Sequence, residues 1–391
     1  MPKYPRLADR LNYLSPSVFE KFLPKMREKG ADLVKLHIGD SYLPPVYSLP
    51  VDDPFIKKFP YFNRYPNTVG TAELRQALSR KIQEDNQLPG EVDNIMMTAG
   101  AANALNVIAM GMINPGEEVL ILAPFWPFFR GMVRLAEGEP VEAPFYTELY
   151  DNPELDIKAY LNQFITDKTV ALYLNTPNNP SGKVLNRAQL QQIREVVEEH
   201  NLWLISDEAY DGMTFDNREH ISIGSFPELF DRTLTVFTFS KVYMFAGLRL
   251  GYMVANAGVI RNLNKILVHE LYSPSAMAQY MMIEPVERRH EWGPDFLAHT
   301  HELRDIVSKN LEIPHHVPEG AYYLFFSVSH LLENRSFQEL VNDCLEIGVS
   351  VAPGNDFGPV YDEYIRICFA GESPERLRIA VERLNKVLQP A

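Results

Sequence analysis

The stretch Thr233–Gly251, TLTVFTFSKVYMFAGLRLG, places two cations directly after a run of apolar residues. The run Thr233–Phe239 is rich in β-branched and aromatic residues, which is typical of a buried strand. Lys241 follows the end of that run, and Arg249 lies two residues from a glycine on either side. A buried strand is thus predicted to deliver an amine to its tip, with a second cation close behind. We expect an anion or a carbonyl to bind there.

Two earlier apolar runs end in polar residues in the same way. Thr169–Asn175 leads into NTPNNPSG, which contains Asn179, and Leu202–Glu208 leads into DEAYDG, which carries Asp207 and Tyr210. Ligands of open α/β sheets bind beyond the carboxyl ends of the strands. We therefore expect these polar side chains and the lysine to meet at one edge of a sheet.

The alternation of strand and helix patterns sets the fold class. Helical periodicity, as in Asn186–Asn201, lies between apolar runs, which favours a mainly parallel central sheet with helices on both faces. After about residue 285 the pattern changes to a smaller α/β unit. We predict an N-terminal arm with part of the small domain over 1–45, a large cofactor-binding domain over 46–285 and a small C-terminal domain over 286–391.

Composition excludes several classes of function. The chain has 391 residues, 46% of them apolar, and a net charge of −14, which argues against nucleic acid or an anionic membrane as the main partner. No stretch approaches the roughly 18 apolar residues of a membrane helix. Cys344 and Cys368 form neither a metal-binding nor a disulfide pattern. We expect a cytoplasmic protein with no metal site.

The polar residues at the strand ends suit one cofactor. A lysine can form a Schiff base with a carbonyl when burial or a nearby cation lowers its pKa. Asp207 would pair with a protonated ring nitrogen. A lysine Schiff base combined with an acidic partner for a pyridinium is the arrangement that pyridoxal-phosphate sites use.

A phosphate group would also need a binding site. TAGAAN (Thr98–Asn103) puts Gly100, Ala101 and Ala102 at a helix start, where free N–H groups and the helix dipole attract anions. Arg249 and the hydroxyl of Thr238 can complete the site. Trp126, in APFWPFF, is a plausible platform for a planar ring.

These motifs together resemble the class I/II aminotransferases, the fold-type-I pyridoxal-phosphate enzymes related to aspartate aminotransferase. The similarity runs from about Leu36 to Phe369. The residues that carry it are Asn179-Pro180-Ser181-Gly182, Asp207-Glu208-Ala209-Tyr210, Ser240-Lys241 with Gly247, Arg249 and Gly251, and Arg366 in YIRICFA.

The resemblance implies a role for each position that binds the cofactor, pyridoxal 5′-phosphate. Lys241 is expected to form the Schiff base and to move the substrate proton, while Asp207 pairs with the pyridinium. Tyr210 and Asn179 are expected to bind the 3-oxygen of the ring. The remaining positions match the ring platform and the phosphate site: Trp126, Gly100, Ala101, Ala102, Thr238 and Arg249.

The resemblance also implies the substrates and the assembly. Arg366 matches the arginine that binds the substrate α-carboxylate, beside the backbone of Gly39 and the amide of Asn179. The expected reaction is a ping-pong transfer between an L-amino acid and a 2-oxo acid. Tyr65 matches a tyrosine that reaches the neighbouring subunit's phosphate, which implies a homodimer.

Some positions depart from the family pattern and leave alternatives open. Thr238 stands where serine or glycine is usual, Met244 is larger than the usual residue, and Ser41 replaces a common proline. An elimination, the cyclisation of a modified amino acid or a decarboxylation would use the same cofactor site. A non-catalytic regulatory protein is the other alternative, although the chain carries no basic DNA-binding extension.

The side chain of the donor is left open as well. Tyr42, Tyr243 and Tyr322 are expected near the mouth by analogy, and they allow aromatic, aliphatic or guanidino donors.

Overall fold

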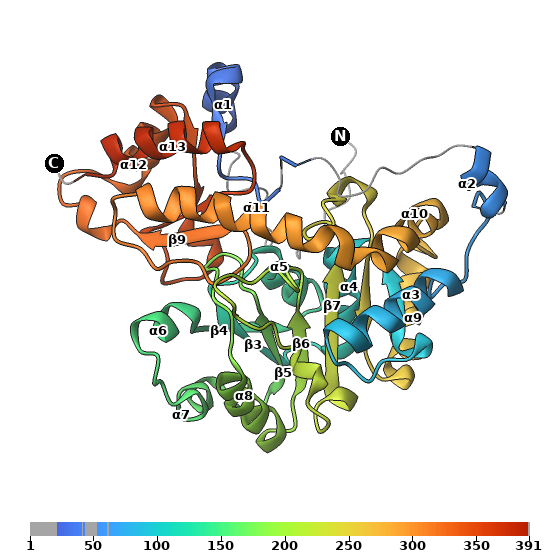
Figure 1. The fold of residues 1–391 in the computed structure, drawn as a ribbon. Helices are drawn as coiled ribbons and strands as arrows, with labels where there is room; N and C mark the ends of the chain where they lie inside the picture. The colour runs from blue at the N-terminus through green and yellow to red at the C-terminus, as the bar shows by residue number, and fades with distance from the viewer. Residues whose placement is uncertain (1–21, 41, 44–52, 61, 390–391) are drawn as a thin grey trace, which may run out of the picture.

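The computed structural model describes residues 22–40, 42–43, 53–60 and 62–389. A seven-stranded sheet forms the centre of its larger part (Figure 1). The strands run in the order β2 (Ile95–Thr98), β8 (Gly251–Val254), β7 (Thr233–Thr238), β6 (Trp203–Asp207), β5 (Thr169–Asn175), β3 (Glu118–Ala123) and β4 (Glu139–Pro144). Only β8 runs against its neighbours, so the predicted mainly parallel sheet is confirmed.

Both faces of this sheet are buried because successive strand residues point to opposite sides. In β3, Val119 and Ile121 pack into one core, whereas Leu120 and Leu122 pack into the other. The first core is covered by α4 (Gly100–Met112), α5 (Phe128–Leu135) and α9 (Ala257–Leu271). The second face is covered by α6 (Tyr146–Asp151), α7 (Ile157–Leu161), α8 (Arg187–Glu199), α3 (Ala72–Asp85) and α10 (Ala276–Glu287).

Helix α8 shows how local sequence defines these elements. Asn186 accepts a hydrogen bond from the Gln189 N–H at 2.9 Å, and the Gln189 side chain accepts one from the Asn186 N–H at 3.0 Å. This capping box satisfies two donors that the first turn cannot pair itself. Leu190 and Ile193, one turn apart, then bury the helix against the sheet. The crossover between β5 and β6 is thereby fixed.

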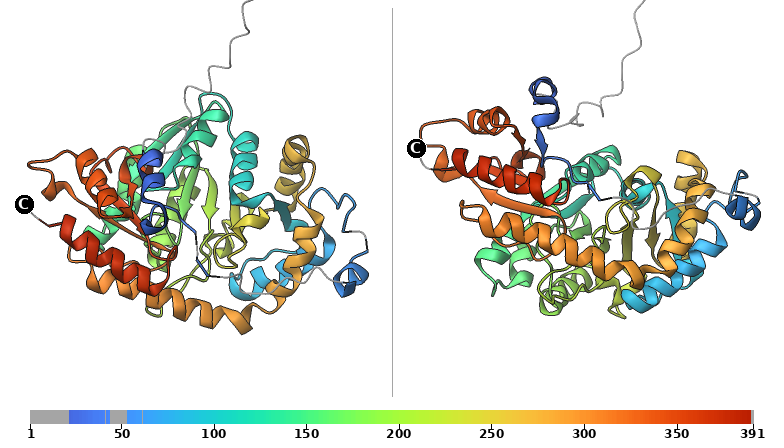
Figure 2. Two further views of the ribbon diagram at one scale, coloured as in Figure 1. Left: turned by 90° about the horizontal axis from the view of Figure 1, so that it is seen from above. Right: turned by 45° about the horizontal axis from the view of Figure 1, so that its top comes forward.

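A second, smaller sheet lies beside the first (Figures 1 and 2). Its three antiparallel strands are β11 (Ala352–Pro353), β12 (Tyr364–Cys368) and β9 (Tyr323–Ser327). A separate parallel pair joins β1 (Val34–Lys35) to β10 (Val349–Ser350). The remaining helices are α1 (Leu23–Lys29), α2 (Asp53–Lys58), α11 (Arg289–Asn310), α12 (Phe337–Glu346) and α13 (Pro374–Val387).

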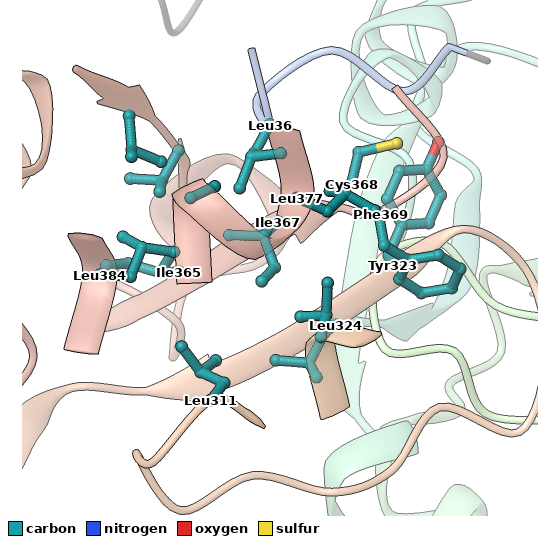
Figure 3. Packing of buried hydrophobic residues seen from close by; sticks show 14 of the residues in the cluster. Leu36, Leu311, Tyr323, Leu324, Ile365, Ile367, Cys368, Phe369, Leu377 and Leu384 are labelled. Carbon is teal, nitrogen blue, oxygen red and sulfur yellow. The ribbon is translucent and has the colours of Figure 1, made fainter. Parts of the chain in front are cut away.

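The small sheet has a core of its own. Figure 3 shows Ile365 and Ile367 of β12 among Leu324 of β9 and two leucines of α13, Leu377 and Leu384. Leu36, just after β1, belongs to the same cluster. Burial of these side chains therefore binds an N-terminal segment to C-terminal strands, each burial contributing roughly 1.5–3 kcal/mol.

Helix α11 differs from the sequence-based expectation. The stretch Phe296–Glu312 has a helical sequence pattern, but the helix begins at Arg289 and continues through Pro294. The first turn is anchored from outside, because Arg289 Nε donates to Asp85 Oδ2 of α3 at 2.5 Å. Tertiary contacts thus override the local Gly-Pro signal. Among the described residues, no helix is both long and apolar enough to cross a membrane.

Candidate active site

A cavity of about 620 Å³ opens at the carboxyl ends of the parallel strands. Residues of the large sheet, of the small sheet and of the segment after β1 all line it. The predicted site residues that line it are Gly39, Ala101, Ala102, Trp126, Asn179, Asp207, Tyr210, Thr238, Lys241, Arg249 and Arg366. Gly100 and Tyr65 are not in the lining and are described below.

Lys241 enters the cavity from the loop after β7. Its Nζ donates a hydrogen bond to the Gly39 carbonyl at 2.6 Å. Burial lowers the pKa of this amine, a shift that nearby Cys368 and Asp40 oppose and that Arg366 and Arg249 reinforce. A lowered pKa leaves more of the amine neutral, which is the form that acts as nucleophile and base.

Asp207 ends β6 and is held from two directions. The Tyr173 hydroxyl donates to its Oδ2 at 2.8 Å, and the Ala209 N–H donates to its Oδ1 at 3.2 Å. Burial raises the pKa of this carboxyl to about 6, although both hydrogen bonds lower it. Above that pH the side chain is a buried carboxylate, which favours a cation beside it.

The neighbouring strand β5 fixes the loop that carries Asn179. Asn175 pairs with Asp207 across the two strands, and its side-chain amide donates to the Asp207 carbonyl at 2.7 Å. The Asn175 Oδ1 accepts a bond from the Asn179 N–H, also at 2.7 Å. Two strand ends are therefore tied together beneath the cavity.

Tyr210 lies at the same edge and is paired with another tyrosine. Its hydroxyl lies 2.6 Å from that of Tyr323, the first residue of β9. Both rings are buried, and burial raises the Tyr210 pKa well above its ordinary value. Burial also raises the pKa of Tyr323, so both hydroxyls keep their protons at neutral pH, and either can be the donor in the bond between them.

The start of α4 and Arg249 form the cationic end of the cavity. Gly100 begins the helix, and a Cβ on it would lie 3.0 Å from Arg249 Nη2, so the guanidinium lies against the helix start. A Cβ on Gly251 would lie 2.9 Å from the Gly100 carbonyl carbon and 3.0 Å from the Ala101 nitrogen. Only glycines allow this approach of β8 to the helix. The free N–H groups and the arginine together favour a bound anion.

Thr238 and Trp126 complete the lining near these groups. The Thr238 hydroxyl donates to Ser240 Oγ at 3.0 Å and accepts a bond from the Ser240 N–H at 3.1 Å. Trp126 is half-buried, and its ring centroid lies 5.2 Å from that of Phe128. Trp126 therefore contributes an aromatic surface to the lining of the cavity.

Arg366 comes from β12 and occupies the opposite end. Its Nη1 donates to Asn179 Oδ1 at 3.0 Å, and its Nη2 donates to the His37 carbonyl at 2.7 Å. The guanidinium lies 4.4 Å from the Tyr323 ring centroid and 5.0 Å from that of Phe357. Among the described residues no atom accepts a hydrogen bond from its buried Nε. A buried guanidinium with a spare donor is suited to a carboxylate.

His37 does not add a charge to this end. Burial, with Arg366 and Lys35, lowers the pKa of its imidazole to about 4. The ring is therefore neutral at pH 7, and Nδ1 lies 2.6 Å from Ser350 Oγ.

Tyr65 lies outside its own chain's cavity. Its side chain is 85% exposed and contacts Tyr272 edge to face, with the ring centroids 5.1 Å apart. Its predicted reach toward a neighbouring subunit remains a prediction.

The prediction that Tyr42, Tyr243 and Tyr322 lie at the mouth is wrong, because none of them lines the cavity. Tyr243 is buried against Phe239 and Trp292, and Tyr322 is buried with its hydroxyl donating to the Lys241 carbonyl at 2.8 Å. Tyr42 pairs with His299 at 2.7 Å, and none of the three lines the cavity. For Tyr322 the reason is the alternation of side chains at the start of β9, because Tyr323 lines the cavity and the residue before it does not.

The other two departures from the family pattern are Met244 and Ser41. Met244 does not line the cavity and has a left-handed backbone, with φ of 57°. Ser41 lies outside the described residues.

Sequence reasoning missed Tyr173, Tyr323 and Phe357. Tyr173 lies two residues before Asn175 on β5, so the period-2 rule could have placed both on one face. No local signal marks the other two, since their positions depend on how the small sheet packs against the large one.

Comparison with known proteins agrees with this geometry. Residues 31–384 match the family described as aminotransferase class I and II. The chain is 31% identical over 396 residues to an aspartate aminotransferase of Pyrococcus abyssi, with 98% of each covered. It is 30% identical, over the same length and coverage, to aromatic-amino-acid aminotransferase 2 of Thermococcus litoralis.

Solved structures with the same fold include enzymes of both kinds. An aromatic aminotransferase from Pyrococcus horikoshii superposes with a TM-score of 0.86 at 30% identity, covering 97% of this chain and 98% of that one. An aspartate aminotransferase from Thermus thermophilus, solved with maleate, gives 0.85 at 28% identity over 98% of this chain and all of that one.

Proposed function

The chain belongs to the class I and II aminotransferases, and from this premise we propose that it uses pyridoxal 5′-phosphate to move an amino group between an L-amino acid and a 2-oxo acid. The observation that carries the cofactor assignment is the shared cavity of Lys241 and Asp207. A buried amine with a lowered pKa and a buried carboxylate line the same space. This pair suits a cofactor that presents an aldehyde and a basic ring nitrogen.

The rest of the lining fits the same cofactor. The N–H groups of Ala101 and Ala102 at the start of α4, with Arg249 and Thr238, would hold the phosphate, and Gly100 leaves room for the guanidinium beside them. Trp126 would pack on the ring. Tyr210 and Asn179 would donate hydrogen bonds to the 3-oxygen.

The substrate carboxylate would bind at the other end. Arg366 offers a planar, buried guanidinium that Asn179 and the His37 carbonyl already orient. A bound carboxylate could accept bonds from two of its nitrogens, and the aromatic rings of Tyr323 and Phe357 exclude water from them. Both the amino acid and the 2-oxo acid carry this group, so one site serves both half-reactions.

The cofactor and the residues around it would have separate roles in the reaction. Pyridoxal phosphate, when bound, supplies an electron sink for the electron pair that remains on the substrate α-carbon when its proton is removed. Lys241 Nζ would take up that α-proton and later return it, a role that its lowered pKa favours because more of the amine is neutral. Asp207 would hold a proton on the ring nitrogen of the bound cofactor. Arg366 fixes the α-carbon relative to the lysine.

We also propose that the working unit is a homodimer in which Tyr65 reaches the partner's phosphate. The exposure of this tyrosine supports the idea, because 85% of a large aromatic surface faces outward. Domain limits near residues 45 and 285, and a cytoplasmic location, remain predictions.

The half-reaction provides the test. Protein loaded with pyridoxal phosphate is mixed with each of the twenty amino acids, with no oxo acid present. A good donor should bleach the visible absorbance and give one equivalent of its 2-oxo acid and of pyridoxamine phosphate, measured by mass spectrometry. Release of ammonia or of a cyclic product would contradict transamination and support the elimination or cyclisation alternative.

A further inference from the structure

Tyr323 contacts both ends of the cavity at once. Its hydroxyl lies 2.6 Å from the hydroxyl of Tyr210, and its ring centroid lies 4.4 Å from the Arg366 guanidinium. The side chain is buried and lines the cavity. Tyr323 is therefore a common neighbour of Tyr210, which is expected beside the cofactor, and of Arg366, which is expected to bind the substrate carboxylate.

The backbone is arranged to bring the two tyrosines together. The Ala321 N–H donates to the Met213 carbonyl at 3.1 Å, and the Phe215 N–H donates to the Glu319 carbonyl at 2.9 Å. The segment before β9 is thus paired with the loop that follows Tyr210. Ala321 has a left-handed backbone with φ of 59°, a conformation that costs a non-glycine residue free energy and is maintained by its surroundings.

Strand register explains the contact with Arg366. In the antiparallel pair of β9 and β12, Phe325 is directly opposite Arg366, and Tyr323 is opposite Cys368. Tyr323 is therefore the diagonal neighbour of Arg366, within reach of a long side chain and an aromatic ring on one face. A cation over an aromatic face is attracted by the ring quadrupole.

The chain also leaves room for the Tyr323 hydroxyl. A Cβ at position 39 would lie only 2.1 Å from that oxygen, so only glycine fits there. The Gly39 carbonyl in turn accepts the bond from Lys241. The hydroxyl therefore lies in a space bounded by the lysine's partner and by Tyr210.

We propose that Tyr323 is a positioning residue. Its hydroxyl donates a hydrogen bond to the Tyr210 hydroxyl, and its ring supports the Arg366 guanidinium. This inference rests on the proposed function. A hydroxyl carries one proton and can donate only one hydrogen bond. Tyr210 can therefore donate to the 3-oxygen of the cofactor only if Tyr323 is the donor in the bond between the two tyrosines. Successive hydrogen bonds of this kind polarise and strengthen one another.

The proposal predicts different effects for the hydroxyl and the ring. In Tyr323→Phe, Tyr210 donates more weakly to the negatively charged 3-oxygen, so the proton on the Lys241 nitrogen is held more tightly. The pH midpoint of the visible absorbance of the cofactor-loaded protein should rise by about 0.5–1. The Kd for propionate, a carboxylate with no amino group, should stay within about twofold because the ring remains.

Removing the ring should affect the other end. Tyr323→Leu should raise the midpoint similarly and weaken propionate binding by about 3- to 30-fold, the loss expected for a cation–π contact. The matched control is Tyr361→Phe, which removes a buried hydroxyl that bonds to Thr147 Oγ1 at 3.1 Å rather than to Tyr210 or Arg366. Its midpoint and propionate affinity should equal those of the unaltered protein.

A double-mutant cycle separates a positioning role from a general structural one. If Tyr323 acts through Tyr210, adding Tyr323→Phe to Tyr210→Phe should leave the midpoint where Tyr210→Phe alone puts it. An unshifted midpoint in Tyr323→Phe, or full additivity in the double variant, would overturn the inference. Absence of any Lys241-dependent visible absorbance in the unaltered protein would instead overturn the proposed function.

Discussion

The two ends of the cavity are built in different ways. At the cofactor end, Asp207, Lys241 and the Asn175–Asn179 loop follow neighbouring parallel strands of one sheet. At the carboxylate end, Arg366 donates hydrogen bonds to Asn179 and to the His37 carbonyl, which are separated from it by 187 and 329 positions in the sequence. The first end is fixed by strand pairing, whereas the second exists only when the small sheet and the segment after β1 pack against the large one. Variants should therefore affect cofactor chemistry at one end and substrate affinity at the other.

Replacing Lys241 should give the largest effect and define the cofactor end. Lys241→Ala should lower turnover by about 10⁴-fold or more, because it removes both the nucleophile and the base. Cofactor should still bind through the phosphate site, but its Schiff-base absorbance should be lost, as measured by spectrophotometry and steady-state kinetics. Lys265→Ala, at an exposed lysine of α9, is the control. Turnover within tenfold of the unaltered enzyme would remove the basis for the assignment.

Arg366→Lys tests the carboxylate end. Lysine keeps the charge but cannot form the planar two-point contact, and it leaves Asn179 or the His37 carbonyl unpaired. We expect kcat/KM for amino acids to fall by about 100-fold or more, mainly through KM. The Kd for pyridoxal phosphate should change little. A KM within threefold of the original would show that another group binds the carboxylate.

Asp207→Asn separates stability from function at the cofactor end. The folded pKa of about 6 lies above the ordinary 3.8, so the apoprotein binds this proton more tightly when folded. The protonated Asp207 contributes its full stabilisation of the folded apoprotein below about pH 4. This contribution is lost as pH rises through 6, which lowers the free energy of unfolding by about 3 kcal/mol near neutral pH. The asparagine variant should therefore unfold at higher denaturant than the original apoprotein at pH 8, with a smaller difference at pH 5.

The same variant should bind the cofactor more weakly, because an amide cannot compensate the ring cation. Equal stability of the two apoproteins at both pH values would contradict the charge argument.

Gly39→Ala should give the smallest effect, at the junction of the two ends. Its Cβ would lie 2.1 Å from the Tyr323 hydroxyl oxygen and 3.0 Å from the ring carbon that bears it. We expect a loss of about 1–3 kcal/mol in the free energy of unfolding. Tyr323→Phe should restore part of that loss, since it removes the closest atom. Gly247→Ala, with no atom within 4 Å of the added Cβ, should leave stability unchanged.

The sequence by itself determined the large sheet and the cofactor end. Continuous apolar runs predicted β5 (Thr169–Asn175) with the bounds that the structure shows and β7 (Thr233–Thr238) to within one residue, and the residues after them line the cavity as expected. This works because strand propensity is local, and because the carboxyl ends of neighbouring parallel strands meet at one edge.

Only the tertiary structure decided which aromatic residues face the substrate and what orients the polar groups. Tyr322 and Tyr323 are adjacent and chemically identical, yet only Tyr323 lines the cavity. The 2.8 Å bond from Tyr173 to Asp207 and the packing of Tyr323 under Arg366 likewise join separate strands. Their placement depends on sheet register and on how two cores pack, and neither is specified by the residues next to them in the chain.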